Sequence, residues 1–315
     1  MVPVSLIALL AAAAQAPAPP SPGQIAQAAP AGEWIRIADD DLLVMTLATP
    51  SGPARRVVIE LMPAPIASAW VANIRRLAAA HWWDATSVNR VQDNYVAQWG
   101  DASEKKPLPA GLEATSARDY TLNWRALPAS AAAPGPVTRW GKDGRAADVY
   151  AEGILWYRGF PLATDARPVA EGRRVWPIHC YGSVGVGRNL APDAGTGAEL
   201  YAVIGHAPRH LDRNIAVVGR VIAGMEYLSS LPRGTGDLGF YEQPGERTAI
   251  TSVRLASDLS AAERPRYSYL STGGTTWPRY VAARRNREPP FFEQPADAAD
   301  VCNIPVPIRT EPAGK

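Results

Sequence analysis

A charge excess of either sign is missing from this 315-residue chain, whose 32 basic and 30 acidic side chains leave a formal net charge of +2. That balance supplies neither the basic footprint of a nucleic-acid-binding protein nor an acidic interaction tail, so no nucleic-acid partner is expected. Histidine is scarce as well, at 4 residues. His206 and His210 are four apart, but Pro208 opposes a helix there and no third ligand is suitably spaced. We therefore expect a polar loop, with no metal and no cofactor.

Apolar runs long enough to cross a bilayer are also missing. The run from Val4 to Ala14 is too short to span one, and it ends in the small-residue pattern Ala14-Gln15-Ala16. This pattern predicts that residues 1–16 are a signal peptide, that no membrane span remains after cleavage, and that the protein is periplasmic or secreted. Because the run has no Lys or Arg before it, an uncleaved N-terminal anchor is the alternative.

The chain has only 2 cysteines, Cys180 and Cys302. Neither belongs to a Cys-x-x-Cys motif, so neither a redox motif nor a zinc site is indicated. In an oxidising compartment two such thiols often pair, which predicts a disulfide between them. One buried thiol and one without a role is the alternative.

Proline and glycine, in contrast, are abundant at 30 and 26 residues, and the 47% hydrophobic and 20% charged content is that of a globular protein. So many turn formers argue against a helical bundle. Short apolar or alternating runs predict strands at residues 42–47, 56–61, 87–91, 95–99, 183–187, 200–204, 215–222 and 248–255. Apolar residues at helical spacing predict a helix whose buried face is formed by Ile66, Trp70, Ile74 and Leu77. A second, short helix is expected around residues 225–231.

These elements predict a mainly β fold, an antiparallel barrel rather than a βαβ sheet. Residues 17–32 are rich in Ala, Pro and Gln and are expected to be a flexible linker. The barrel domain is expected over residues 33–256, with a long insertion at about 102–178, and residues 257–315 form a C-terminal extension. A segment as long as this insertion is usually functional or partly disordered.

The stretch SVNRVQDNYVAQWGD at residues 87–101 is the part of the sequence most informative about chemistry. Residues two apart in a strand share a face, so Arg90 and Gln98 can line one surface from neighbouring strands. Tyr95 and Val96 add an apolar wall near the turn. An arginine and an amide beside an aromatic wall suit a neutral group that carries a carbonyl.

This stretch resembles the cyclophilin family of peptidyl-prolyl isomerases, whose motif is aromatic-x-Arg followed by Phe-Met-x-Gln-x-Gly-Asp. Two further blocks resemble the family in the right order: GAELYAVI at 197–204, and HLD at 210–212 followed by VGRVIAGM at 218–225. A weaker match, NIRRL at 73–77 with Trp83 and Asp84, precedes them. The resemblance covers residues 40–256 without the insertion. It implies a closed eight-stranded barrel with two capping helices and an external groove.

The resemblance also implies roles for single residues. Arg90 corresponds to the catalytic arginine, and Gln98 to the residue that orients the peptide backbone. The substrate-binding positions that line or adjoin the proline pocket are Tyr95, Val96, Gly187, Tyr201, His210, Leu211 and Ile215. The implied activity is cis–trans isomerisation of X-Pro bonds in exported polypeptides, to assist their folding, with proline-containing polypeptides as partners.

Several residues depart from the family pattern. Val88 stands at the aromatic position, Val96 is shorter than Met, and Glu199 replaces a Gln that helps order the groove. Ile215 occupies a position that is His or aromatic in other members. These departures predict reduced or altered activity, since Arg90 is present. The alternative is a non-catalytic protein that uses the same barrel to bind proline segments. An unrelated hydrolase would need a Ser/His/acid set that the sequence does not show.

Overall fold

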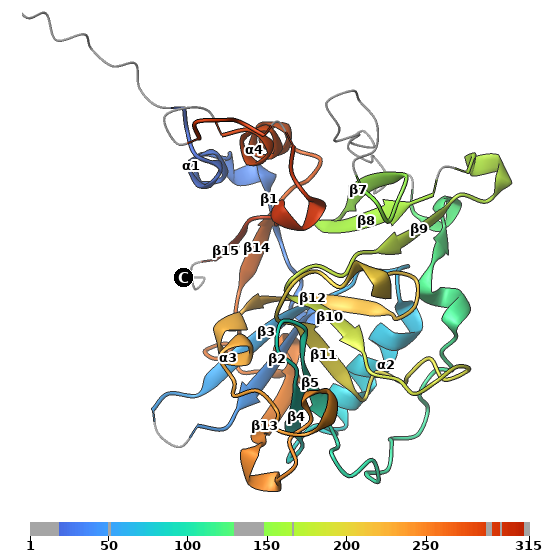
Figure 1. The fold of residues 1–315 in the computed structure, drawn as a ribbon. Helices are drawn as coiled ribbons and strands as arrows, with labels where there is room; N and C mark the ends of the chain where they lie inside the picture. Colours follow the sequence, from blue (N-terminus) through green and yellow to red (C-terminus); the bar gives the residue numbers. More distant parts are fainter. Residues whose placement is uncertain are drawn as a thin grey trace, which may run out of the picture.

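The protein is described by a computed structural model that covers residues 19–49, 52–128, 148–165, 167–287, 292–296 and 298–311. The predicted signal peptide, residues 1–16, lies outside the described residues. The centre of the fold is a closed barrel of eight antiparallel strands in the order β10-β11-β5-β4-β13-β2-β3-β12 (Figure 1). The prediction of a mainly β barrel is therefore confirmed.

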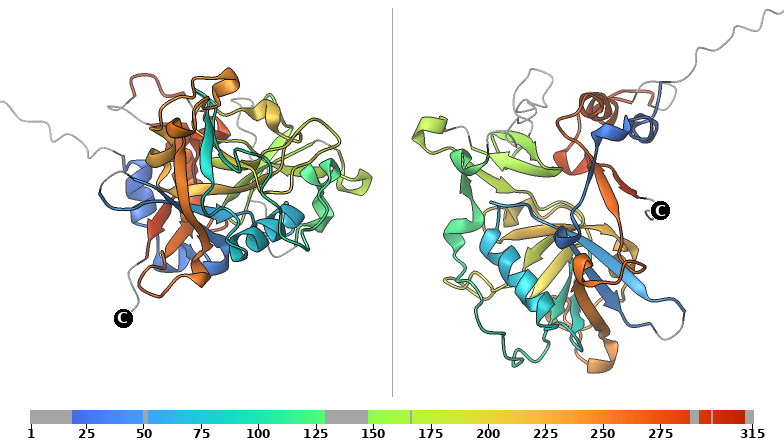
Figure 2. Two further views of the ribbon diagram at one scale, coloured as in Figure 1. Left: turned by 90° about the horizontal axis from the view of Figure 1, so that it is seen from below. Right: turned by 180° about the vertical axis from the view of Figure 1, so that it is seen from behind.

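The barrel strands follow the eight predicted segments, with ends that differ by at most two residues. They are β2 (Leu42–Leu47), β3 (Arg55–Leu61), β4 (Ser87–Val91), β5 (Val96–Gly100), β10 (Ser183–Val186), β11 (Leu200–Val203), β12 (Val217–Ala223) and β13 (Thr248–Leu255). Two helices accompany the barrel: α2 (Ser68–Ala79) and α3 (Met225–Ser229). Figure 2 shows α2 lying along the outside of the barrel.

Helix α2 is held by its apolar face, as its periodicity predicted. Trp70, Ile74 and Leu77 are fully buried in the barrel core. The indole Nε1 of Trp70 also donates to the carbonyl oxygens of Ala194 and Gly195, at 3.1 and 2.8 Å. This helix therefore anchors the loop that precedes β11, in addition to covering the barrel.

The insertion carries a sheet that the sequence did not predict. Its strands are β6 (Leu122–Asn123), β7 (Gly153–Tyr157), β8 (Phe160–Thr164) and β9 (Arg174–Pro177), in the order β6-β9-β8-β7. Side chains alternate between the two faces of this insertion sheet. Leu155 and Tyr157 join the barrel core, whereas Ile154 and Trp156 join a second apolar cluster. The insertion sheet is therefore packed on both faces.

The two ends of the described chain form a further unit, here called the terminal layer. It consists of α1 (Pro22–Gln27), β1 (Trp34–Arg36), β14 (Tyr267–Leu270), α4 (Thr276–Arg285) and β15 (Ile308–Thr310), with β14 between β1 and β15. In Figure 1 it lies above the barrel beside the insertion sheet.

The expectation of a flexible linker over residues 17–32 is wrong for part of that segment. Helix α1 packs against α4, and Ile25 and Ala26 are buried in the second apolar cluster. A capping box formed by Ser21 and Gln24 closes the start of the helix. Local composition suggested a linker, but the apolar residues of α1 have a partner about 250 residues later in the chain, which local composition does not reveal.

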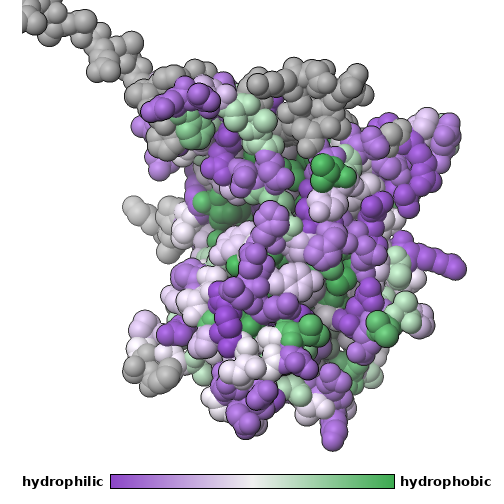
Figure 3. Space-filling model, viewed as in Figure 1, coloured by the Kyte–Doolittle hydropathy of each residue, from purple (hydrophilic) through white to green (hydrophobic). Residues whose placement is uncertain are grey.

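The predicted disulfide is present and joins Cys180, just before β10, to Cys302 of the terminal layer. Among the described residues, no helix is long and apolar enough to cross a membrane. The face seen in Figure 3 is mostly hydrophilic, with apolar residues in small separate groups.

Candidate active site

A cavity of about 520 Å³ opens on the outer surface of the barrel. Seven of the nine predicted catalytic and substrate-binding residues line it: Arg90, Tyr95, Val96, Gln98, Gly187, Tyr201 and Ile215. The other two, His210 and Leu211, adjoin it. The ring of His210 stacks on Tyr95 with centroids 6.4 Å apart, and Leu211 packs against the apolar residues of the cavity.

Strand register brings the central residues together. Arg90 on β4 is the cross-strand partner of Gln98 on β5, and Gln98 is the partner of Tyr201 on β11. Tyr201 in turn faces Gly185 on β10. Directly paired residues project to the same side of a sheet, so these residues form a row across four adjacent strands. The pairing of β5 with β11 thus brings together side chains that are about 100 residues apart in sequence.

The guanidinium of Arg90 is held from several directions. Its Nη1 donates to Gln98 Oε1 at 3.1 Å, its Nη2 donates to Gln92 Oε1, and its Nε donates to the carbonyl oxygen of Leu238 at 2.8 Å. A guanidinium has five N–H donors, so these bonds leave two for a substrate. Partial burial lowers the pKa of Arg90, but arginine stays charged at ordinary pH. The result is a fixed cation with donors to spare.

An apolar hollow lies beside this cation. It is formed by the buried residues Val96, Tyr201 and Val203 and the partly buried Tyr95, Leu211 and Ile215. Burial raises the pKa of the Tyr95 and Tyr201 hydroxyls, so both phenols are neutral. The hollow is therefore an uncharged surface next to a positive charge, suited to an apolar ring attached to a polar amide.

Glu199 extends the cavity beyond Gln98 with a carboxyl group. The carboxyl lies against Gly100, where a Cβ atom would come within 1.9 Å of its Oε1. Loss of solvent raises the pKa of Glu199 to about 7, although hydrogen bonds from the Asp101 backbone and the side chains of Asn89 and Gln98 favour the ionised form. The sequence identified Glu199 as a departure from the family. Its unusual protonation follows from burial, which the sequence does not reveal.

Sequence reasoning missed Phe240. β13 pairs only with Ser87 and Val88 of β4. The segment after α3 runs along the rest of this strand, where Gly234 N donates to Val91 O and Tyr241 N donates to Asn89 O. This pairing places the centroid of the Phe240 ring 5.3 Å from the Arg90 guanidinium carbon, and the Tyr95 ring is 5.8 Å from the same carbon. Phe240 is one of only 4 phenylalanines in the chain and stands among glycines, which was the available signal.

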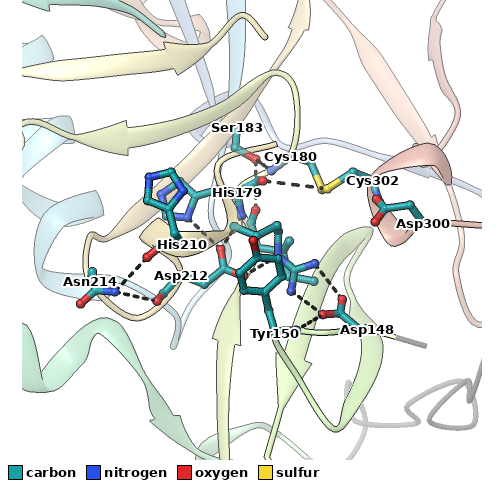
Figure 4. A network of polar contacts seen from close by, with 12 residues as sticks. Asp148, Tyr150, His179, Cys180, Ser183, His210, Asp212, Asn214, Asp300 and Cys302 are labelled. Carbon is teal, nitrogen blue, oxygen red and sulfur yellow. Dashed lines mark hydrogen bonds and ion pairs between the residues drawn. A yellow bond between two sulfur atoms is a disulfide. The ribbon is translucent and has the colours of Figure 1, made fainter. Parts of the chain in front are cut away.

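His179 was missed as well, and it belongs to a buried polar network behind the hollow (Figure 4). Its Nε2 lies 3.0 Å from the Tyr201 hydroxyl and its Nδ1 lies 3.0 Å from Asp212 Oδ1. Asp212 Oδ2 accepts from Arg209 Nε at 2.6 Å. The only sequence signal was a histidine directly before Cys180. Asp212 lies close to His206 and His210 in sequence, but its carboxylate binds His179 and Arg209 instead.

Comparison with known proteins gives a consistent result. The model of the cyclophilin type peptidyl-prolyl cis-trans isomerase family matches residues 44–255. A search of curated proteins found no match.

Among solved structures, the chain is similar to the cyclophilin AquaCyp293 from Hirschia baltica, with 23% identity and a TM-score of 0.62, over 88% of this chain and 93% of that one. It is more distantly similar to a cyclophilin type peptidyl-prolyl cis-trans isomerase of Cryptosporidium parvum solved in the presence of the dipeptide Ala-Pro. There the identity is 11% and the TM-score 0.36, over 67% and 98% of the two chains.

Proposed function

Because this chain belongs to the cyclophilin-type peptidyl-prolyl cis-trans isomerase family, we propose that it speeds cis–trans exchange of X-Pro bonds in exported polypeptides and so assists their folding. The observation that carries the proposal is the fixed Arg90 guanidinium, with two free donors, at the edge of the apolar hollow. These are the two features that the reaction requires.

The reaction is rotation about a tertiary amide, whose barrier is about 18–20 kcal/mol. At the twisted transition state the prolyl nitrogen loses amide resonance and gains a lone pair. A guanidinium that donates to this nitrogen opposes resonance and lowers the barrier, and dry surroundings strengthen that hydrogen bond. The hollow grips the proline ring on one side of the bond. Gln98 accepts from Arg90 and donates to Glu199, so its side chain is held beside the guanidinium, where the peptide backbone would lie.

Arg90→Ala tests this mechanism. Loss of one positioned donor lowers kcat by about 10²–10³-fold, so proline-peptide isomerisation should fall to near the uncatalysed rate while peptide binding persists. Arg233→Ala is the matched control, since Arg233 is a half-exposed arginine that pairs with Asp93 on the surface. Equal activity in wild type and Arg90→Ala would refute the mechanism. Peptide binding without any rate enhancement in wild type would favour a non-catalytic proline-binding protein.

Two observations support action outside the cytoplasm. One is the apolar run from Val4 to Ala14 that ends in Ala14-Gln15-Ala16, and the other is the disulfide between Cys180 and Cys302, a bond typical of oxidising compartments. The N-terminal sequence and thiol content of the protein recovered from cell fractions test the proposal. We expect a periplasmic or secreted chain that begins at residue 17 and has no free thiol; a full-length cytoplasmic chain with two thiols would contradict it.

A further inference from the structure

The ring and the hydroxyl of Tyr201 have different surroundings. Its ring is buried in the floor of the apolar hollow, whereas its hydroxyl lies 3.0 Å from His179 Nε2. A Cβ atom at position 185 would lie 2.3 Å from both Cζ and Oη of this phenol, so Gly185 provides the space that the ring occupies. Gly185 therefore leaves space for the Tyr201 ring, and His179 provides a hydrogen-bond partner for its hydroxyl.

The hydrogen-bond directions in this network follow from Asp212. Its Oδ1 accepts from both the backbone N–H and the ring Nδ1–H of His179, each at 3.0 Å, because a carboxylate only accepts. The Nε2 of a neutral ring then accepts the proton of the Tyr201 hydroxyl. That hydroxyl is protonated because complete burial raises its pKa well above the usual value. The chain Tyr201–His179–Asp212 thus has one consistent set of donors and acceptors.

Asp212 connects this chain to the insertion. Its Oδ2 accepts from Arg209, whose Nη1 and Nη2 donate to the Asp148 carboxylate at 2.7 and 3.2 Å. The Arg209 guanidinium also lies over the ring of Tyr150, 5.1 Å from its centroid. All of these polar side chains but Tyr150 are buried or nearly so, so their bonds are shielded from water.

The turn at Arg209–Leu211 also carries part of the site wall. Leu211 packs in the apolar hollow, and His210 stacks on Tyr95. Figure 4 shows that this turn, the insertion and the Cys180–Cys302 disulfide of the terminal layer meet around His179. The floor and one wall of the hollow are therefore fixed from behind by residues that touch no part of the cavity.

We propose that His179 is a positioning residue of the isomerase site, which holds Tyr201 by its hydroxyl and, through Asp212 and Arg209, ties the floor of the apolar hollow to Asp148 of the insertion. This role rests on the proposed function, because it assigns the hollow to the proline ring. It gives the insertion a task at the site: to keep the hollow in its binding geometry. Arg90 is held by separate partners. The network should therefore affect the affinity for the proline ring more than the rate of isomerisation.

Tyr201→Phe tests the hydroxyl without emptying the floor. This hydrogen bond lies within the protein, so its loss weakens peptide binding only by releasing the floor of the hollow, and one net hydrogen bond of ordinary strength limits that effect to about fivefold. We expect the Kd for an Ala-Pro-containing peptide, measured by NMR titration, to rise by up to about fivefold, with a smaller change in kcat from exchange spectroscopy. Tyr157→Phe is the matched control, since its hydroxyl donates to Ala64 O at 2.7 Å outside the cavity. A Kd that changes equally in both variants would overturn the proposal.

His179 and Asp148 provide the second test. His179→Gln keeps a group that can accept from the Tyr201 hydroxyl and should restore most of the affinity that His179→Leu loses. Asp148→Asn should weaken peptide binding in the same direction, although Asp148 does not line the cavity. Melting temperatures establish that the variants are folded. Unchanged peptide affinity in folded His179→Leu and Asp148→Asn would sink the positioning role.

The same measurements separate this role from the proposed function. If wild type binds the peptide but does not speed its isomerisation, the proposed function is wrong, while the relative Kd values still decide the role of His179. If wild type is active and Tyr201→Phe matches it in both Kd and kcat, the isomerase stands and the positioning role falls.

Discussion

Replacement of Glu199 by glutamine should stabilise the protein at neutral and alkaline pH. Burial raises the pKa of Glu199 from 4.5 to about 7 in the folded state. The folded protein therefore holds this proton more tightly than the unfolded chain does. The stabilisation is complete below about pH 4.5 and is lost as the pH rises through about 7. A rise of the pKa from 4.5 to about 7 corresponds to about 3 kcal/mol of unfolding free energy.

The magnitude can be worked out for a practical pH range. Between pH 5 and pH 8, the ionisation of Glu199 removes about 2–3 kcal/mol of unfolding free energy from wild type. Glutamine has a similar shape and remains neutral throughout, so the stability of the variant does not respond to pH through this position. The stability advantage of Glu199→Gln over wild type should therefore grow by that amount from pH 5 to pH 8.

Urea unfolding followed by tryptophan fluorescence measures this advantage, because the chain has 10 tryptophans and several are buried in the core. Glu226→Gln, at an exposed position on α3, is the control for loss of a surface carboxylate. If the difference between Glu199→Gln and wild type stays the same from pH 5 to pH 8, the carboxyl group is ionised at ordinary pH, and burial does not control its protonation.

Three further perturbations test other parts of the structure. Burial raises the pKa of Glu60, so Arg220→Met, which removes its 2.7 Å partner, should leave a buried, protonated carboxyl group and lower the unfolding free energy by about 1–3 kcal/mol, measured by urea unfolding; an unchanged unfolding free energy would contradict the pairing. Reduction of the disulfide, which spans a sequence separation of 122 residues, should lower the unfolding free energy by about 2–5 kcal/mol, and equal denaturation midpoints with and without reductant would count against this. Gly185→Ala places a Cβ atom 2.3 Å from the Tyr201 ring and should weaken proline-peptide binding in a titration, unlike Gly245→Ala, where a Cβ atom meets nothing within 4 Å.

The barrel strands could be predicted because each is specified by residues that are close together in sequence. Each strand is a short run bounded by turn residues, and the period of two assigns its faces. β2 and β3 show this best: Leu43, Met45 and Ile59 point into the barrel core, whereas Leu42 and Val58 point outward. Arg90 and Gln98 of the central row could be predicted for the same reason, since they belong to one hairpin. Tyr201 was predicted only through the family resemblance, and Gly185 was not predicted.

The sheet of the terminal layer could not be predicted, because its strands pair over long distances in sequence. The insertion sheet was missed although β7 and β8 form a tight hairpin, in which Tyr157 pairs with Phe160. β1 at residues 34–36 pairs with β14 at residues 267–270, and neither segment is long enough to give a clear periodic pattern. His179 escaped notice for a related reason. Its partners Tyr201 and Asp212 lie 22 and 33 residues away. Tyr201 comes close because β11 pairs with β10, the strand that follows His179.

The nearly continuous apolar run of β2 contained a signal about the outer layers. In a barrel with one face in water, outward residues such as Leu42 and Val44 would be polar. Both are buried in the second apolar cluster instead, against Trp277 of the terminal layer and Trp156 of the insertion sheet. Burial of both faces of a barrel strand requires a covering layer from elsewhere in the chain. The insertion and the terminal layer are thus built into the packing of the barrel. Asp148 of the insertion reaches the floor of the site by a separate route, the hydrogen bonds through Arg209, Asp212 and His179.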